Sequence, residues 1–504
     1  MRFDVLIVGA GPSGVMAANL LGKAGLSVGL LDKEASIFPL PRAAVIDDDI
    51  ARIFQNADLE KELLEITSVS KGYQFLNQND EVMFGFVRDA TPSMHGYPTS
   101  FCIRQPEVEG IMREGLKRYP NVKLFSEHEV TLVEQFNGHV ELTVLNKQLN
   151  ETTQFAADYV IGADGARSIV RKQSDIVFEN MEFDHPWLIV DFEITDDLSL
   201  VKRNLQYCQP DRPVTFIYLG RNLYRFEIML KPEEDIEALN QEENVRELLR
   251  DLIDPDKIII ERHVTYVFHA LIAEQWQKDR VFLIGDAAHQ MPPFLGQGLS
   301  SGIRDAANIA WKIEHVLKKD ASTSLLETYH TERYPHVHNI MKQAITLGRI
   351  IQAPTRELAD FRDAIFRYLN SIPNISAALN QIERSKSPIG EGLHHSSLNH
   401  TDRVAYPQFT LNEQLLDKIV ARSFSILVHP NIDIKKLEND YLKFKLIQLP
   451  NEPRVIDWFN SQNATFAIVR PDGYVYGWSN EESLNRITSD LEVTLYTEKD
   501  AVLS

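Results

Sequence analysis

The chain has 504 residues, and at about 150 residues per domain this length predicts two to four domains. Hydrophobic residues make up 44% and charged residues 25% of the chain, as in soluble globular proteins. The formal net charge is −20, and a field of this sign repels nucleic acid and anionic membranes, so we expect neither as a partner.

Cysteine usage and the amino terminus indicate the compartment. Cys102 and Cys208 are the two cysteines, and they lack zinc-ligand or dithiol spacing. The chain starts directly with a strand pattern, and no apolar run reaches about 18 residues. We therefore expect a cytoplasmic protein with no metal site.

The first glycine-rich stretch follows a short apolar strand, Val5–Val8, and opens a helix over Val15–Leu21. Gly9, Gly11 and Gly14 form G-x-G-x-x-G, in which the first glycine permits the turn, the second removes a Cβ from the pyrophosphate and the third lets helix and strand pack. The next strand ends on Asp32, where a carboxylate can accept ribose hydroxyls. This unit predicts a bound dinucleotide, and the alternative is a parallel sheet with a glycine-rich turn.

The segments that follow are less specific. Pro39 and Pro41 stiffen a loop in which Arg42 either reaches the pyrophosphate or is solvated. Residues 105–118 read as a helix, and Asn137-Gly138 joins two strands of a hairpin. In residues 158–171, DYVIGADGARSIVR, a buried strand runs into Asp164-Gly165, which by itself could be an ordinary turn.

Residues 176–270 read mainly as strands, which suggests a separate layer over the cofactor, with a charged surface helix at 234–252. The third glycine-rich element, residues 280–313, is a strand ending at Gly285-Asp286, a loop in which Gly296 and Gly298 form a second backbone cradle, and an apolar helix. A polar stretch at 385–401 reads as a linker. The last hundred residues alternate strands, at 424–429, 444–448, 465–469 and 493–496, with helices. This part contains no cysteine and cannot perform dithiol chemistry, so it is expected to be a structural cap or a dimer contact.

As an ordered set, the three elements resemble the FAD-dependent aromatic hydroxylases with the para-hydroxybenzoate hydroxylase fold. The likeness is greater to 3-(3-hydroxyphenyl)propionate hydroxylases and phenol-type enzymes, through PLPRA at 39–43, CQPDRP at 208–213, RFEIML at 225–230 and RPDGY at 470–474. Asp32-Lys33 departs from the more usual Glu-Arg, but the shorter acid can still accept ribose hydrogen bonds. The resemblance implies an α/β protein with a Rossmann-like FAD-binding domain (1–70, 98–175 and 270–385), an inserted, mainly β substrate-binding domain (71–97 and 176–269) and a C-terminal thioredoxin-like α/β domain without redox cysteines (400–504).

The resemblance also implies roles for individual residues. The cofactor-binding residues would be Gly9, Gly11, Gly14, Asp32, Lys33, Arg42, Gln105, Asp164, Asp286, Gly298, Leu299 and Ser300, the last three meeting the isoalloxazine. Asp164 is associated in the family with both FAD and NAD(P)H. Pro293 would face the flavin and Arg225 would assist its reduction. His289 is included as a catalytic candidate, although a packing role in its loop is the commoner one.

The implied function is a monooxygenase in which NAD(P)H reduces FAD, and O₂ then supplies one oxygen atom, through a flavin C4a-hydroperoxide, to a phenolic ring. A 3-(3-hydroxyphenyl)propionate-like acid is the expected substrate, and Arg212 or Arg225 would attract its carboxylate. The alternatives are a monooxygenase of an N-heteroaromatic compound, an FAD-dependent oxidase or dehydrogenase, and a non-catalytic FAD-binding module. A homodimer is one possible assembly.

Overall fold

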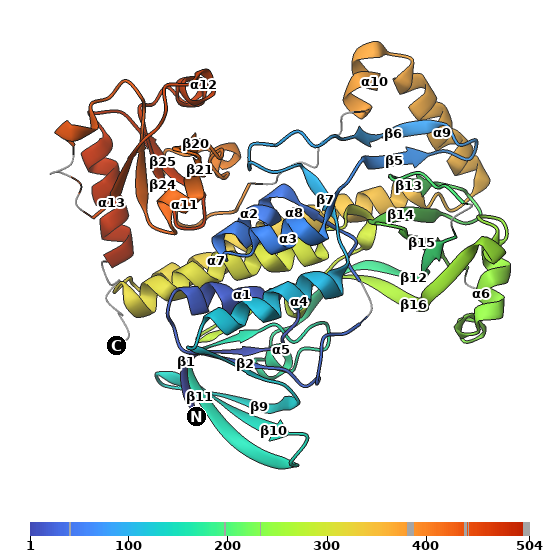
Figure 1. The fold of residues 1–504 in the computed structure, drawn as a ribbon, viewed down its shortest axis with the longest axis horizontal. Helices are drawn as coiled ribbons and strands as arrows, with labels where there is room; N and C mark the ends of the chain where they lie inside the picture. Colours follow the sequence, from blue (N-terminus) through green and yellow to red (C-terminus); the bar gives the residue numbers. More distant parts are fainter. Residues whose placement is uncertain are drawn as a thin grey trace.

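The computed structural model describes residues 1–39, 42–195, 198–231, 233–380, 388–437, 441 and 443–496. Pro41, one of the two prolines expected to stiffen the loop before Arg42, lies outside these residues, as does position 385, where the FAD-binding domain was expected to end and the linker to begin. No helix of the described part combines the length and apolarity needed to cross a bilayer. Figure 1 shows two long helices, α7 (Gly298–Lys318) and α8 (Ser324–Ile351), running across the middle of the molecule.

The first sheet contains the predicted dinucleotide-binding unit. Its strands follow the order β17-β18-β11-β1-β2-β8, with β1 at Arg2–Val8, β2 at Val28–Leu31, β8 at Val122–Phe125, β11 at Glu151–Gly162, β17 at Gln277–Lys278 and β18 at Val281–Leu283. Strand β1 pairs in parallel with both β2 and β11. Strands of this kind are covered on both faces, which explains their continuous apolar runs. The hairpin predicted at Asn137-Gly138 is confirmed between β9 (His128–Phe136) and β10 (His139–Asn146).

Helices cover this sheet and lead into a small three-stranded sheet. Helix α1 (Pro12–Lys23) packs against α7 and α4 (Gln105–Gly115), and Pro12 in its first turn starts the helix without losing an internal hydrogen bond. Helices α2 (Asp48–Asn56), α3 (Glu60–Ile66) and α5 (Ile169–Gln173) are shorter. The small sheet consists of β3 (Val45–Asp47), β4 (Ser68–Val69) and β7 (Ser100–Cys102).

The second large sheet combines strands from two distant parts of the chain. Its order is β19-β16-β12-β15-β14-β13-β5-β6, with β5 at Gly72–Leu76, β6 at Val82–Val87, β12 at Phe178–Ile194, β13 at Asn204–Tyr207, β14 at Val214–Gly220, β15 at Leu223–Met229, β16 at Ile258–Ala273 and β19 at His289–Gln290. The predicted mainly β layer is therefore present. The helix expected over 234–252 is shorter than predicted: only Glu242–Leu249 forms α6, because the Asp235 carboxylate accepts hydrogen bonds from the Glu237 and Ala238 N–H groups and stabilises a turn instead.

The C-terminal part is a four-stranded sheet of order β23-β22-β24-β25, with β22 at Ser425–Val428, β23 at Lys445–Gln448, β24 at Phe466–Val469 and β25 at Val475–Ser479. Helices α11 (Leu416–Val420), α12 (Pro453–Ser461) and α13 (Leu484–Tyr496) and the short strands β20 (Thr410–Leu411) and β21 (Gln414–Leu415) complete it. The strand predicted at 493–496 is wrong, because these residues end α13. The buried residues Leu484, Ile487, Leu491 and Leu495 recur at helical spacing.

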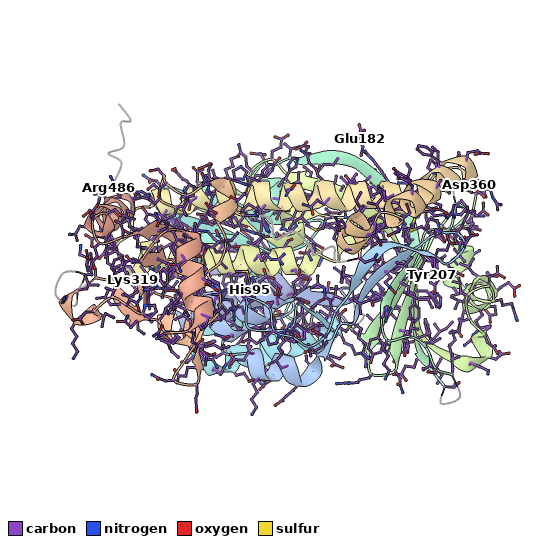
Figure 2. All side chains as sticks on the ribbon, turned by 90° about the horizontal axis from the view of Figure 1, so that it is seen from above. His95, Glu182, Tyr207, Lys319, Asp360 and Arg486 are labelled. Carbon is purple, nitrogen blue, oxygen red and sulfur yellow. The ribbon has the colours of Figure 1, made fainter. Side chains whose placement is uncertain are left out.

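The C-terminal sheet and helices α9 (Arg356–Asn370) and α10 (Pro373–Leu379) lie at opposite ends of the molecule, as Figure 2 shows by the positions of Arg486 and Asp360. A buried ion pair fixes the C-terminal part to the central helices. The Arg470 guanidinium donates to both carboxylate oxygens of Glu332 in α8, each at 2.8 Å, and Lys312 of α7 donates to the same carboxylate at 2.9 Å. The guanidinium and ammonium groups together hold the pKa of Glu332 well below its usual range, against the effect of burial.

Candidate active site

The turn between β1 and α1 uses its three glycines differently. Gly9 has φ +102°, and a Cβ there would lie 2.4 Å from the Ala163 carbonyl oxygen, whereas a Cβ at Gly14 would lie 2.0 Å from the Gly9 oxygen. A Cβ at Gly11 would meet no atom within 4 Å. Gly9 and Gly14 are thus needed by the fold itself, and Gly11 faces open space beside a helix N-terminus, as a pyrophosphate cradle requires.

Asp32 stands at the end of β2, as predicted, but its carboxylate already has a partner that the sequence did not reveal. Arg113 of α4 donates to Asp32 Oδ2 at 3.1 Å and to the Ala10 carbonyl oxygen at 2.8 Å. The neighbouring Lys33 is exposed, and its carbonyl oxygen accepts from Lys147 Nζ at 3.1 Å. Arg113 therefore orients the acid beside the glycine turn.

The loop that contains Arg42 is held from α4. Gln105 Oε1 accepts from the backbone N–H groups of Arg42 at 3.2 Å and Ala43 at 2.8 Å. Asp286 lies in the short turn Gly285–Ala287 after β18 and is exposed. The surrounding protein desolvates its carboxyl group and raises its pKa, while His289 and Arg42 act in the opposite direction. The charge of Arg42, distant in sequence, thus acts on the Asp286 carboxyl group.

Asp164 has a local function in this structure. Its Oδ2 accepts from the Ile169 N–H at 2.7 Å and its Oδ1 from the Ser168 hydroxyl at 2.6 Å. It therefore stabilises the start of α5, and burial raises its pKa. A direct role of Asp164 toward FAD or NAD(P)H stays a prediction.

The predicted flavin-facing residues form the loop before α7 and the first turn of that helix. Pro293 begins a short 3₁₀ turn, Pro293–Leu295, and Gly296 follows with φ +61°. Gly298, Leu299 and Ser300 supply first-turn N–H groups, which have no acceptor inside the helix. Ser300 Oγ is buried and finds no hydrogen-bond partner among the residues described. The open Gly11 turn, the exposed Asp286 and this helix start suit the pyrophosphate, ribityl chain and ring of FAD.

Two of the catalytic candidates are enclosed by protein contacts. Arg225 donates to Asp191 Oδ1 at 2.6 Å and Oδ2 at 3.1 Å, and to the Arg42 carbonyl oxygen at 2.8 Å. His289 is fully buried, with Nε2 2.7 Å from Asp305 Oδ2. These contacts favour the packing interpretation for His289 and make Arg225 a support for the Arg42 loop.

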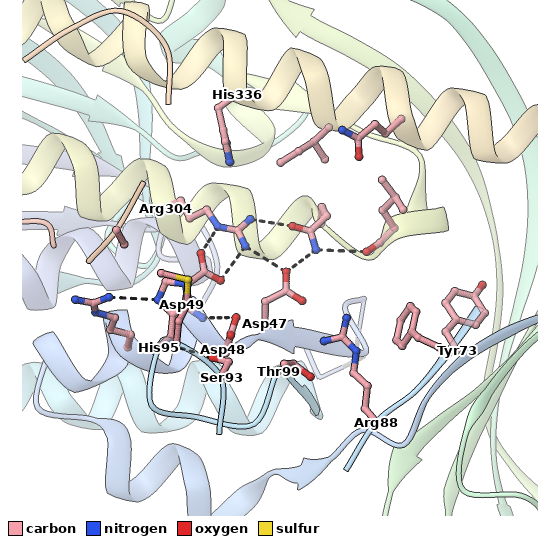
Figure 3. A pocket seen from close by; sticks show the side chains of 18 of the residues that line it. Asp47, Asp48, Asp49, Tyr73, Arg88, Ser93, His95, Thr99, Arg304 and His336 are labelled. Atoms are coloured by element: carbon pink, nitrogen blue, oxygen red, sulfur yellow. Dashed lines mark hydrogen bonds and ion pairs between the residues drawn. The ribbon is translucent and has the colours of Figure 1, made fainter. Parts of the chain in front are cut away.

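A cavity of about 1410 Å³ lies between the second sheet, helices α2, α7 and α8 and the C-terminal turn at Asp472 and Tyr474. One part has an aromatic and aliphatic wall of Tyr73, Phe75, Phe84, Phe86, Phe294 and Leu295. The other part is polar. There, Arg304 donates to Asp49 at 2.6 and 3.0 Å, to Asp47 at 3.2 Å and to Gln297 Oε1 at 2.8 Å (Figure 3). His336 lines the same part, and sequence patterns gave no sign of it.

The arginines predicted to attract an acidic substrate do not line this cavity. Arg212 is paired with Glu234 at 2.6 Å and 2.9 Å, and Arg225 with Asp191. Each guanidinium is thus paired with a carboxylate, and a role of either arginine toward an incoming anion stays a prediction. Arg88 and Lys342 are cations that do line the cavity. Within the described residues, no group of His, Cys, Asp or Glu is arranged to hold a metal.

Comparisons with known proteins agree with this geometry. The model of the FAD binding domain family matches residues 2–344. A probable NADH-specific resorcinol 4-hydroxylase from Rhodococcus jostii is 32% identical, over 95% of this chain and 92% of the relative. A 3-(3-hydroxy-phenyl)propionate/3-hydroxycinnamic acid hydroxylase from Klebsiella pneumoniae is 31% identical, over 94% of this chain and 91% of that protein.

Among solved structures, a complex of aklavinone-11 hydroxylase with FAD and aklavinone has a TM-score of 0.79 at 17% identity, covering 98% of this chain and 99% of that one. The flavin-dependent monooxygenase PieE has a TM-score of 0.78 at 20% identity, with the same coverage of 98% and 99%. At these identities the likeness establishes the fold, including its C-terminal part.

Proposed function

Because the chain belongs to the FAD binding domain family and is an FAD-dependent aromatic hydroxylase, we propose that its substrate is a one-ring phenol with a second polar substituent. A neutral dihydroxybenzene of the resorcinol type is the first candidate. The observation that carries this choice is the polar part of the cavity, where the positive charge of Arg304 is compensated by Asp47 and Asp49. Such a surface offers hydrogen bonds without attracting an anion.

The protein would contribute binding, orientation and exclusion of water. FAD, when bound, supplies the capacity to accept a hydride from NAD(P)H and to transfer one oxygen atom of O₂. Gly11 would admit the pyrophosphate, Asp286 would hold the ribityl chain, and the first turn of α7 would receive the ring. The aromatic wall would hold the phenol and keep water from it.

A phenolic acid of the 3-(3-hydroxyphenyl)propionate type is the second candidate. Arg88 and Lys342 line the cavity, and a carboxylate could pair with either. The relative from Klebsiella is named for such an acid, which supports this candidate without excluding the first. Because the net charge of −20 opposes an incoming anion, binding of the acid should weaken markedly with salt if a cation guides it.

The test is a substrate panel on purified FAD-loaded protein. NADH and NADPH oxidation is followed with resorcinol, 3-(3-hydroxyphenyl)propionate and a hydroxypyridine, together with peroxide and hydroxylated product. We expect resorcinol to stimulate oxidation most and to be hydroxylated, with little effect of salt on its apparent KM. Stimulation by the hydroxypyridine alone, or peroxide release without product from every compound, would contradict the proposal. Homodimer formation and a cytoplasmic location stay predictions, and light scattering of the same sample tests the former.

A further inference from the structure

His336 of α8 is held in one tautomer by its neighbour. The guanidinium of Arg333 lies with Nη1 2.8 Å from His336 Nδ1. A guanidinium can only donate, so Nδ1 must be the acceptor, and the proton of the neutral ring is therefore on Nε2. The side chain is only 6% exposed, yet it lines the cavity, into which Figure 3 shows it projecting from α8.

Arg333 is itself fixed by the elements expected to hold the flavin. Its Nε donates to Asp305 Oδ1 at 2.9 Å, and its Nη2 lies 3.4 Å from the Ser301 carbonyl oxygen in the first turn of α7. The other oxygen of Asp305 accepts from the Gly285 N–H at 3.1 Å. The imidazole is therefore positioned by the Gly285-Asp286 turn and by the start of α7.

The surroundings keep the ring neutral. Burial lowers the pKa of His336 well below its usual value, and Arg333, Arg304 and His289 act in the same direction, while Asp49 opposes them. Within the described part of the chain, no oxygen or nitrogen accepts a hydrogen bond from Nε2. A donor that faces a cavity from a largely buried ring is available to an acceptor on a ligand.

We propose that His336 Nε2–H donates a hydrogen bond to the phenolic oxygen of the bound substrate and so stabilises the phenolate, which rests on the phenol hydroxylation proposed above. The phenol proton leaves to solvent, and the histidine neither gains nor loses a proton. A ring with an ionised oxygen is richer in electrons and is attacked more readily by an electrophilic oxygen atom. His336 is thus a specificity-determining residue for phenols over aromatic rings without an oxygen substituent.

The test separates this role from a structural one. His336→Asn keeps an acceptor at the position of Nδ1 for Arg333 but removes the donor that reaches the cavity, whereas His336→Gln keeps a donor at about that reach. His338→Asn is the matched control, since His338 lies on the same helix, stacks on Tyr334 and does not line the cavity. FAD content and thermal midpoint are measured for all four FAD-loaded proteins. Each is titrated with 4-nitrophenol, whose phenolate absorbs visible light, and difference spectra are recorded from pH 5 to 9.

We expect the wild type to bind 4-nitrophenol as the phenolate, with an ionisation constant raised over that of the free phenol. In His336→Asn this constant should fall about tenfold, a shift of one pH unit, with FAD content unchanged; His336→Gln should recover part of it, and His338→Asn should match the wild type. An unchanged constant in His336→Asn would overturn the role of His336 while leaving phenol hydroxylation intact. A wild type that binds no phenol and is stimulated by none would overturn both.

Discussion

The glycine turn after β1 and the polar part of the cavity differ in how far apart in the sequence their contacting residues lie. At the turn, a Cβ at Gly14 would strike the Gly9 carbonyl oxygen at 2.0 Å, a contact within one short motif, and Ala163 is the distant residue that packs against it. In the cavity, Arg304 joins residues about 250 positions apart, donating to Asp47 at 3.2 Å. A substitution in the turn should therefore act on folding or on FAD alone, whereas one in the cavity should affect several elements together.

The largest effect is expected at Gly14. Gly14→Ala places a methyl group against backbone, which cannot move aside as a flexible side chain can, so the free energy of unfolding should fall by about 4 kcal/mol. Gly110→Ala is the matched control in helix α4, where a Cβ meets nothing within 4 Å, and it should stabilise by up to about 1 kcal/mol. Urea unfolding of the two variants measures the difference, and equal stabilities would contradict the packing role of Gly14.

Arg304→Leu should have the next largest effect, since it leaves the Asp47 and Asp49 carboxylates without their guanidinium partner. Loss of a largely buried ion-pair partner should cost about 3 kcal/mol. Gln297 would lose one of its contacts at the same time, so the flavin absorbance spectrum should shift as well. Denaturant unfolding and the visible spectrum give the two readouts. A stability loss with an unaltered flavin spectrum would show that the polar part of the cavity does not position the loop before α7.

Gly11→Val tests the other side of the comparison. Its Cβ has open space around it, so the fold should keep its stability, while the pyrophosphate would be held off the backbone. We expect FAD affinity to fall about 100-fold, or about 2.7 kcal/mol, by fluorescence titration of the FAD-free protein. A variant that unfolds as readily as Gly14→Ala would show that Gly11 serves the fold and not the cofactor.

The smallest expected effect is a change of folding stability with pH. The pKa of His336 is lowered in the folded protein. Below the ordinary histidine pKa of about 6.5, His336 is therefore protonated in the unfolded chain but not in the folded one. Wild-type stability should then decrease relative to His336→Asn by about 1.4 kcal/mol per pH unit as the pH falls from 6.5. Chemical denaturation between pH 5 and 7.5 measures this. A constant difference between the two proteins would mean that folding does not lower the pKa of His336.

The local elements were predictable from the sequence, and the long-range ones were not. The strand, turn and helix around Gly9 and Gly14 are encoded within about thirty residues, and the hairpin at Asn137-Gly138 by two. His336 and Arg304 gave no local signal, because the cavity becomes polar only when α2, α7 and α8 come together. The pairing of Arg212 with Glu234 gave no local signal for the same reason. The strand predicted at 493–496 was wrong because four residues are too few to distinguish a strand from the last turn of a helix.

Oxygen transfer itself is the central claim, and isotopic labelling measures it most directly. FAD-loaded protein is mixed with NADH and resorcinol under ¹⁸O₂, and the hydroxylated product is examined by mass spectrometry. We predict that the product gains one ¹⁸O atom and that none comes from labelled water. Unlabelled product, or NADH consumption that yields only labelled peroxide with resorcinol and with phenolic acids, would contradict it.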